Sequence, residues 1–514
     1  MDSVIMSLRF ARGTFPARWR AGLAAGARVL LYLWLSQIEG VAQISNFSSS
    51  QATAAAYRPD RILIQPKAGI SPVALASFHA AQKGEVLQTF AEIGGLQVLR
   101  VPAEETVPGL IAKYQQSGLV NFAEPDYFGR VFATPNDPKY LDGTLWGLNN
   151  TGQNGGTADA DIDAPEGWDV LRSASNIVVA VLDTGVRYTH EDLAANMWVN
   201  SSDGGHGTNA LAGTTDPSDD SGHGTMVAGI LGAVGNNGKG VTGVAWQVQI
   251  MACKCFNNFG VGDVSAVVAC LDYARANGAR IVNASWGFTN SLALSNAFIS
   301  VRDAGIVVVA AAGNAGTNID IAPTYPASYD FDNVVTVAYT TRNDALGTNS
   351  NYGAANVDLA APGENIYSTF GATDSFYYSN TGSSFAAPYV AGALALMLAR
   401  YPAEAYRQII DRLLNATDPL PSLSGKCATG GRLNLRNALS PFVRLAVIPG
   451  TGAGPIQLRV TADPSRTCVI EISTDLTSWS PVLTNATSAG GTFDFTDDLS
   501  TNSARRFYRA AFSP

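Results

Sequence analysis

The sequence predicts an α/β protein with a mostly parallel sheet and helices on both faces, preceded by a small α+β domain and followed by a small all-β sandwich. Three observations predict this organisation. Strand-like apolar runs alternate with helix-like segments from residue 146 to about residue 438, which is typical of a parallel sheet. A shorter β-α-β-β-α-β pattern comes before them. After about residue 441, short strands are separated only by turn residues.

The composition indicates a compact protein of several domains. At 514 residues the chain is too long for one ordinary domain, and two to four are expected. The 51 glycines and a charged fraction of only 15% indicate many tight turns rather than disorder. The net charge of −9 argues against nucleic acid as a partner. The five cysteines lack the spacing of metal ligands, so we expect buried structural thiols.

The first 42 residues resemble an export signal. Several arginines precede the apolar run at residues 29–35, and small residues follow at 40–42. We therefore expect a signal peptide at residues 1–42 and a secreted or extracellular protein, with the cell surface and the periplasm as alternatives. The run is too short to span a bilayer, and no stable membrane span is expected elsewhere. A misassigned start codon or a membrane-surface helix would also fit this segment.

Residues 58–130 are expected to form a small domain. Six segments carry strand or helix patterns in the order strand, helix, strand, strand, helix, strand. They are residues 61–65, 72–83, 85–90, 96–101, 107–116 and 120–127. This order is that of the ferredoxin-like arrangement. No catalytic set appears in this domain, and a linker with two prolines, residues 131–138, separates it from the next.

Residues 131–440 are predicted to contain the parallel sheet. The apolar run at residues 177–182 is expected of a strand that is covered on both faces. Further strands are expected at 249–253, 280–284, 306–310 and 333–338, and helices at 223–234, 263–276, 291–303 and 403–414. Residues 384–400 are apolar on nearly every side, which predicts a buried helix with Ser384 and Pro388 in its first turn. Catalytic groups are expected beyond the carboxyl ends of the strands.

The C-terminal residues 443–514 change in character. Short apolar segments alternate with Gly, Pro, Ser and Asn turns, which predicts a small β-sandwich. The expected strands are residues 445–447, 456–460, 468–472, 492–495 and 506–510. This domain carries no evident catalytic set.

Three polar motifs stand where predicted strands or helices begin or end. Asp183 ends a strand, His223 opens a helix in Ser-Gly-His-Gly-Thr, and Ser384 lies in the turn before the buried helix. A serine hydroxyl becomes a nucleophile when a neutral imidazole removes its proton, and a carboxylate orients the imidazole. Each residue alone could be a turn or capping residue. Their common setting in Gly-rich turns favours a catalytic triad.

A fourth motif supports the same chemistry. Asn314 follows the apolar strand at residues 306–310 in a Gly-Asn turn. A tetrahedral intermediate needs hydrogen-bond donors aimed at its oxyanion, and the Asn314 amide with the Ser384 backbone N–H would supply two. A left-handed turn residue is the alternative interpretation of Asn314.

These four motifs together resemble the subtilisin-like serine proteases, or subtilases, of the S8 family, over about residues 131–440. The resemblance implies a triad of Asp183, His223 and Ser384, with Asn314 in the oxyanion hole. It implies a secreted endopeptidase that forms an acyl-enzyme, and a zymogen whose small N-terminal domain is an inhibitory propeptide that is cut off near residues 132–136. The family's Gly-Thr-Ser-Met-Ala reads Gly382-Ser-Ser-Phe-Ala here, so Ser383 is a competing nucleophile.

The resemblance also implies substrate and metal sites. Ser285, Trp286 and Gly287 would pair with extended peptide substrate, while Ala312 and Gly313 would wall the pocket for the side chain before the cut. Asp192 and Asn237, the latter in the loop at residues 235–241, would bind a structural Ca²⁺, and no catalytic cofactor is implied. A plain Gly-Asn turn is the alternative for that loop. We expect a monomer that acts on proteins or peptides and binds its own propeptide.

Two other functions fit parts of the sequence. Asp183-Thr-Gly and Asp220-Ser-Gly each match the short motif of aspartic proteases, whose two carboxylates share a proton. That hypothesis leaves His223, Asn314 and Ser384 unexplained. A binding protein that keeps the fold and uses its β-sandwich would need none of these residues.

Overall fold

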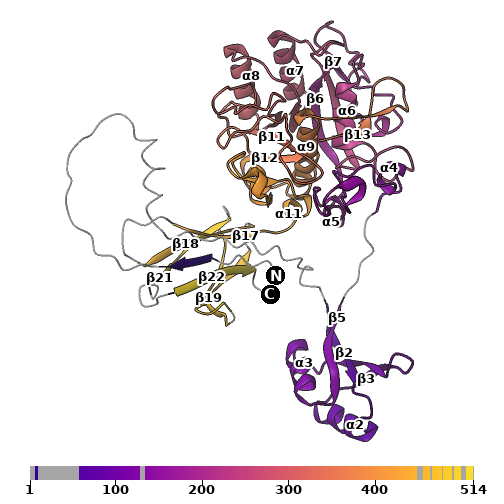
Figure 1. Cartoon of the computed structure of the whole chain (residues 1–514), viewed down its shortest axis with the longest axis vertical. Helices are drawn as coiled ribbons and strands as arrows, with labels where there is room; N and C mark the ends of the chain where they lie inside the picture. The colour runs from indigo at the N-terminus through magenta and orange to yellow at the C-terminus, as the bar shows by residue number, and fades with distance from the viewer. Residues whose placement is uncertain are drawn as a thin grey trace, which may run out of the picture. The chain divides into compact units, whose positions relative to one another are not determined.

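The computed structural model describes residues 6–9, 57–127, 134–448, 455–463, 466–476, 478–488, 491–498 and 505–512. Residues 132–441 form one compact unit (Figure 1). Of the predicted export signal, only β1 (Met6–Arg9) is described, and it pairs antiparallel with β22 (Arg505–Phe512). The rest of that signal lies outside the described residues, so the signal peptide stays a prediction.

The N-terminal domain is a four-stranded antiparallel sheet with two helices. Its elements are β2 (Tyr57–Pro66), α2 (Pro72–Ala81), β3 (Val86–Phe90), β4 (Leu96–Arg100), α3 (Val107–Gln116) and β5 (Val120–Tyr127). The strand order β3-β4-β2-β5 is that of the ferredoxin-like fold. Ile62, Leu99 and Leu110 are fully buried in its core. Thr106 caps α3 by accepting a hydrogen bond from the Gly109 N–H.

The large domain is built on a nine-stranded sheet. The strands are β6 (Ser173–Asp183), β7 (Gly207–Asn209), β8 (Gln247–Lys254), β9 (Ile281–Ala284), β10 (Val307–Ala311), β11 (Val334–Thr340), β12 (Leu359–Pro362), β15 (Asp418–Pro419) and β16 (Gly431–Arg432). Their order is β15-β16-β12-β11-β10-β9-β6-β8-β7. Every neighbouring pair is parallel except β15 and β16. A separate hairpin joins β13 (Ile366–Thr369) and β14 (Tyr377–Asn380).

Helices cover both faces of this sheet, as predicted. The helices of the domain are α4 (Pro138–Leu141), α5 (Ala164–Trp168), α6 (His223–Gly232), α7 (Val264–Ala276), α8 (Leu292–Asp303), α9 (Ser383–Arg400), α10 (Tyr406–Asn415) and α11 (Leu435–Leu439), with short 3₁₀ turns at Gln153–Gly155, Ala194–Asn196 and Pro421–Leu423. Side chains alternate between faces along β6. Val179 and Val181 pack with α6 and α9, whereas Ala180 and Leu182 pack with α7 and α8.

Helix α9 is the central helix of the large domain (Figure 1). It is long and apolar enough to cross a membrane by length and composition alone, but 83% of it is buried, as in the core helix of a soluble fold. The prediction that Pro388 lies in its first turn is wrong. The helix begins at Ser383, so Pro388 lies in the second turn and cannot donate to the Ser384 carbonyl four residues earlier.

The C-terminal part holds two antiparallel sheets. Its strands are β17 (Val443–Val447), β18 (Ile456–Ala462), β19 (Thr467–Ser473), β20 (Ser480–Ala486), β21 (Thr492–Asp497) and β22. One sheet has the order β17-β18-β21 and the other β1-β22-β19-β20. Leu458, Ile470 and Tyr508 are fully buried between them. The alternation of buried and exposed residues along β18 is that of a sheet with one face in a core.

Candidate active site

The carboxylate of Asp183 lies at the carboxyl end of β6, against the first residue of α6. Its Oδ1 atom accepts hydrogen bonds from the Nδ1 atom of His223 and from the Thr184 N–H, both at 2.7 Å. The side chain is almost completely buried. Its Oδ2 atom is also buried and has no hydrogen-bond partner among the described residues. The arrangement fixes one edge of the imidazole and leaves the Nε2 edge for other partners.

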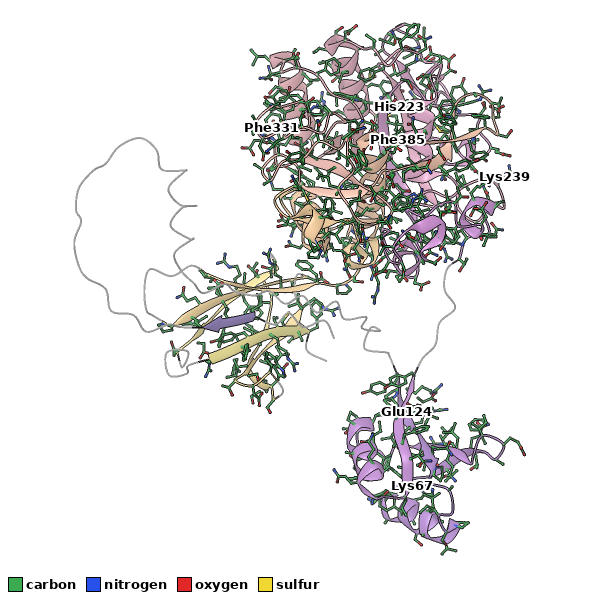
Figure 2. The ribbon with its side chains drawn as sticks, viewed as in Figure 1. Lys67, Glu124, His223, Lys239, Phe331 and Phe385 are labelled. Atoms are coloured by element: carbon green, nitrogen blue, oxygen red, sulfur yellow. The ribbon has the colours of Figure 1, made fainter. Side chains whose placement is uncertain are left out.

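His223 is held between Asp183 and the aromatic ring of Phe385. The two ring centroids are 5.4 Å apart (Figure 2). Burial lowers the pKa of His223, but the charge of Asp183, its hydrogen bond and the charge of Asp219 outweigh burial and raise that pKa above its ordinary value. The side chain keeps 31% of its surface exposed. It can therefore exchange a proton with a group that enters from solvent.

Ser384 is the second residue of α9 and is half-buried. Its hydroxyl donates to the Ser285 carbonyl at 3.1 Å, and the Ser285 hydroxyl donates to the Ser384 carbonyl at 2.9 Å. No hydrogen bond joins Ser384 to His223 in the described part of the chain. Ser383 is fully buried, accepts from the Gly313 N–H and donates to Asn314. Ser384 therefore has the more accessible hydroxyl.

The side-chain amide of Asn314 is oriented by Ser383. Its Oδ1 atom accepts from the Ser383 N–H at 2.8 Å and from the Ser383 hydroxyl at 3.0 Å. These contacts occupy the oxygen and leave the Nδ2 group free to donate. Gly382 lies beside that nitrogen, where a Cβ atom would approach to 3.0 Å. A glycine at this position thus keeps space for the amide donor.

A cavity of about 420 Å³ adjoins this cluster. Ser285, Trp286 and Gly287 line it, whereas Ala312 and Gly313 are not among its lining residues. The contact of all five with substrate stays a prediction. Trp286 is held by a 2.8 Å hydrogen bond to the Leu182 carbonyl. The cavity is lined by Asp183, Thr184, Ser221, His223, Phe256, Asn258, Phe259, Gly260, Ser285, Trp286 and Gly287.

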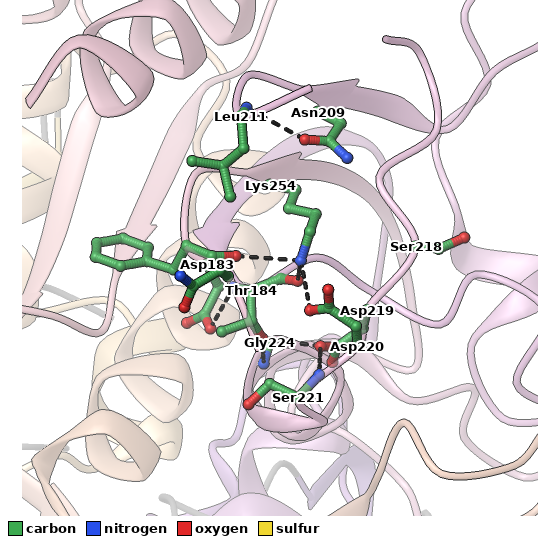
Figure 3. A network of polar contacts seen from close by, with 12 residues as sticks. Asp183, Thr184, Asn209, Leu211, Ser218, Asp219, Asp220, Ser221, Gly224 and Lys254 are labelled. Carbon is green, nitrogen blue, oxygen red and sulfur yellow. Dashed lines mark hydrogen bonds and ion pairs between the residues drawn. The ribbon is translucent and has the colours of Figure 1, made fainter. Parts of the chain in front are cut away.

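Asp219 is a site residue that the sequence analysis missed. Its carboxylate is mostly buried and lies beside Ser221 and Gly224, at the start of α6 (Figure 3). One oxygen accepts from the Thr184 hydroxyl and from the backbone N–H groups of Ser221 and Gly222, each at 2.9 Å. The other accepts from the backbone and hydroxyl of Thr225. An acid at a helix start is stabilised by free N–H groups, and only its position before His223 could have indicated the role.

The predicted calcium ligands lie near one another. Asp192 is fully buried, and Asn237 contacts it through the amide nitrogen at 2.8 Å, while the Asn237 oxygen accepts from the Lys239 N–H. The sequence analysis missed Asp137, which is also fully buried and accepts from the Asn236 and Asn237 N–H groups. Burial, and to a lesser extent the charge of Asp192, raise the pKa of Asp137. The Asp192 carboxylate also accepts from the Val241 N–H and from the Tyr377 hydroxyl, so each oxygen of the two carboxylates already has a donor and the calcium site stays a prediction.

The described residues do not bring together a larger group of potential metal ligands. Within these ranges, no three His, Cys, Asp or Glu side chains are placed to hold an ion. The five cysteines are all buried and unpaired by disulfides, as expected for structural thiols.

Comparison with known proteins defines the class to which this fold and site belong. The model of the subtilase family matches residues 174–437, and the model of the fervidolysin N-terminal prodomain matches residues 44–126. Because the first match covers more than half of the chain, the protein belongs to the subtilase family. It is a subtilisin-like serine endopeptidase with an N-terminal prodomain.

Individual relatives agree with this assignment. Thermitase of Thermoactinomyces vulgaris is 38% identical over 51% of this chain and 85% of its own length. A thermophilic serine proteinase of Bacillus sp. (strain AK1) is 36% identical over 57% of this chain and 66% of its own length. The cell wall-associated protease of Bacillus subtilis (strain 168) is 33% identical, but only 35% of its length is covered.

A solved protease of Pseudoalteromonas arctica PAMC 21717 is 30% identical, with a TM-score of 0.49, over 60% of this chain and 99% of that one.

Membership of the subtilase family sets aside the aspartic-protease hypothesis. In keeping with this, Asp220 pairs with Lys254 rather than with Asp183.

Proposed function

We propose that this protein cleaves peptide bonds with Ser384 as nucleophile, His223 as general base and Asp183 as the group that orients His223. The observation that carries the proposal is the 2.7 Å hydrogen bond between Asp183 and the Nδ1 atom of His223. It fixes the tautomer whose Nε2 atom can accept a proton. In the reaction the Ser384 hydroxyl turns from the Ser285 carbonyl to this nitrogen and attacks the substrate carbonyl carbon.

The attack forms a tetrahedral intermediate with a negatively charged oxygen. The Nδ2 group of Asn314 and the Ser384 backbone N–H donate to this oxygen, and the start of α9 adds its positive dipole end. His223 then gives its proton to the leaving amine, and an acyl-enzyme remains on Ser384. Water, deprotonated by His223, hydrolyses the ester and restores the hydroxyl. Each proton taken up by His223 is thus released in the following step.

Peptide substrate binds as an extended strand beside Ser285–Gly287. The cavity along these residues also contains Phe256 and Phe259, and the ring of Phe259 is 83% exposed. An exposed aromatic side chain beside a backbone edge favours apolar substrate residues. We infer that main-chain pairing sets the binding register, with Ala312 and Gly313 near the residue that precedes the cut.

The N-terminal domain acts as an inhibitor of its own protease until the chain is cut near residues 132–136. A described domain without a catalytic set, matched by a prodomain model, supports this precursor role. Export through the segment at residues 1–42 would place the protease outside the cell, and the similarity to a cell wall-associated protease supports such a location. A structural Ca²⁺ held by Asp137, Asp192 and the Asn237 side chain would offset the two buried carboxylates. Chelation should then lower the unfolding temperature of the Ser384→Ala protein; no change would refute this site.

Precursor processing tests the proposal. Wild type and Ser384→Ala are produced in a protease-deficient host, and their intact masses are compared. The proposal predicts loss of the N-terminal 130 or so residues in wild type and a full-length Ser384→Ala protein. Ser383→Ala, at the buried neighbour, should still be processed. Equal shortening of Ser384→Ala would contradict self-processing.

A further inference from the structure

A buried lysine lies directly beside the proposed catalytic carboxylate. Lys254 ends β8 and is paired in register with Asp183 on β6. It is only 5% exposed, and the residues before it, Ile250 to Cys253, are fully buried and apolar or weakly polar. Burying an ammonium group is costly unless its charge and its protons are satisfied. Its presence in this strand therefore needs an explanation.

All three protons of the Lys254 ammonium group have acceptors. The Nζ atom donates to the Thr184 carbonyl at 2.5 Å and to the Asp220 carboxylate at 2.7 Å (Figure 3). It also donates to the Phe256 carbonyl at 3.1 Å. These acceptors belong to three different segments. Thr184 follows Asp183, Asp220 lies three residues before His223, and Phe256 lines the substrate cavity. One side chain thus links the segments that carry both groups of the acid-base pair and one wall of the cavity.

Thr184 is held from two sides by buried groups of opposite charge. Its hydroxyl donates to Asp219 at 2.9 Å and accepts from the Gly224 N–H at 3.0 Å, while Lys254 binds its carbonyl. The next peptide group after Asp183 is therefore fixed relative to the start of α6. Because the Asp183–His223 hydrogen bond spans the same two elements, a shift of Thr184 would alter it directly.

The charge of Lys254 is only partly neutralised. Asp220 is its one carboxylate partner among the described residues, and that side chain is 55% exposed. Its other two acceptors are neutral carbonyl groups. Buried ion pairs often add little net stability, and an apolar residue of similar size can stabilise a fold equally well. Stability alone therefore does not explain a lysine at this position. Contacts to two backbone carbonyls at the site indicate a positional role instead.

We propose that Lys254 is a positioning residue, which holds the Thr184 and Phe256 carbonyls so that Asp183 stays aligned with His223. This inference rests on the proposed function of that pair. Lys254 touches neither substrate nor the reacting atoms. Its effect reaches the reaction through Thr184 and Asp183. Besides Asp183 and His223 themselves, the charged groups around this pair are Asp219, Asp220 and Lys254. The buried thiol of Cys255 also lies near Asp183.

A graded set of substitutions tests the role. Lys254→Arg, Lys254→Gln and Lys254→Met are made in the full chain, and kcat is measured per active site, with sites counted by a fluorophosphonate. The number of available N–H donors falls along this series, so kcat should fall in the same order. A loss of about 10- to 100-fold is expected for Lys254→Met, because small misplacements of catalytic groups have effects of this size. KM should stay within about twofold to threefold, since the cavity side chains remain.

The control is Lys426→Met, because Lys426 contacts the ring of Tyr352 rather than the site. It should keep the wild-type kcat. If Lys254→Met does not fold, the order of kcat per active site among wild type, Lys254→Arg and Lys254→Gln still tests the proposal. Equal kcat per active site in the folded variants, or a loss with Arg as large as with Gln, would overturn the proposal. A purely structural role would lower the count of active sites without lowering kcat per site.

A spectroscopic measurement separates this inference from the proposed function. In the Ser384→Ala background, the proton between His223 Nδ1 and Asp183 should give a low-field NMR signal. Adding Lys254→Gln should shift or broaden it, and an unchanged signal would refute positioning by Lys254. If the signal is absent before Lys254 is changed, or if Ser384→Ala remains active, the proposed function fails first.

Discussion

Ser285 and Ser384 exchange two hydrogen bonds, one through each hydroxyl and each carbonyl. The exchange has a specific cause in the sequence. Pro388 has no N–H group to donate to the Ser384 carbonyl, which leaves that carbonyl available to the Ser285 hydroxyl. The segment beside the cavity is thereby attached to the start of α9. The proline that interrupts the hydrogen bonds of the helix thus allows the proposed nucleophile, Ser384, to be held beside Ser285, in the segment that we propose to bind substrate.

Replacing Ser285 tests this link. Ser285→Ala leaves the Ser384 carbonyl without its donor, so the free energy of unfolding should fall by about 1 kcal/mol. The comparison is made by denaturant unfolding in the Ser384→Ala background, which prevents self-digestion. Ser300→Ala, on the exposed side of α8, is the matched control and should be neutral. Equal stability of the two variants would show that the link contributes nothing.

Asn314 offers a substitution that separates the donor from the acceptor. Asn314→Asp keeps an oxygen for the two Ser383 contacts but removes the N–H donor and adds a negative charge. We expect kcat to fall by about 10²- to 10³-fold or more, with KM little changed, because the oxyanion forms only after binding. Steady-state kinetics on a peptide substrate measure both. A large rise in KM with unchanged kcat would contradict an oxyanion role.

The activity should depend on pH through His223. Only neutral imidazole can act as the base, and the environment of Asp183 and Asp219 raises the pKa of His223 above its ordinary value of 6.5. The value of kcat/KM should therefore fall as the pH drops through a point above 6.5. Asp183→Asn should remove most activity and move the remaining acid limb to lower pH. If kcat/KM of the wild type falls on the acid side with an apparent pKa at or below 6.5, the assignment of His223 as a base with a raised pKa is contradicted.

Stability should depend on pH through Asp163, a half-buried acid directly before α5. Burial and neighbouring carboxylates raise the pKa of Asp163 from 3.8 to about 7. Its unfolded form ionises more readily, so the stabilising contribution is complete below about pH 4 and is lost as pH rises through about 7. Asp163→Asn should therefore flatten the fall in unfolding temperature between about pH 4 and pH 7.

The unfolding temperature of Asp163→Asn should also be measured in the Ser384→Ala background. Asn tolerates the left-handed backbone at this position, where φ is 53°, and can still accept from Asn434. The exposed Asp272→Asn is the control and should leave the pH profile as it is. Parallel profiles for Asp163→Asn and the unmodified protein would show that Asp163 does not titrate in this range.

Local patterns were sufficient to predict most of the sheet. The apolar run at residues 177–182 lies within β6, and the helix expected at residues 107–116 is α3, with the bounds expected. The hairpin of β13 and β14 was missed, because its strands have four residues each and the loop between them is rich in turn residues. Pro388 was placed one turn too early although the expected helix start was almost right. The proline is the fifth residue counted from Ser384 and the sixth counted from the observed start at Ser383, beyond the first turn in either case.

The candidate site was predictable only where motifs are short and local. Asp183, His223, Asn314 and Ser384 each belong to a short motif that can be recognised in the sequence. Asp219, Lys254 and Asp137 act through contacts with segments distant in sequence, so no local pattern separates them from ordinary surface charges. A charged residue within an apolar strand, as at Lys254, was the one signal that could have been followed.

The central claim is that Ser384 is the nucleophile. A fluorophosphonate should react with the mature protein, and peptide mapping by mass spectrometry should locate the adduct on Ser384. Ser383→Ala loses one of the two contacts that orient Asn314, so it should label more slowly but still on Ser384. Ser384→Ala and His223→Ala should not label. An adduct on Ser383, or equal labelling of Ser384→Ala, would contradict the account.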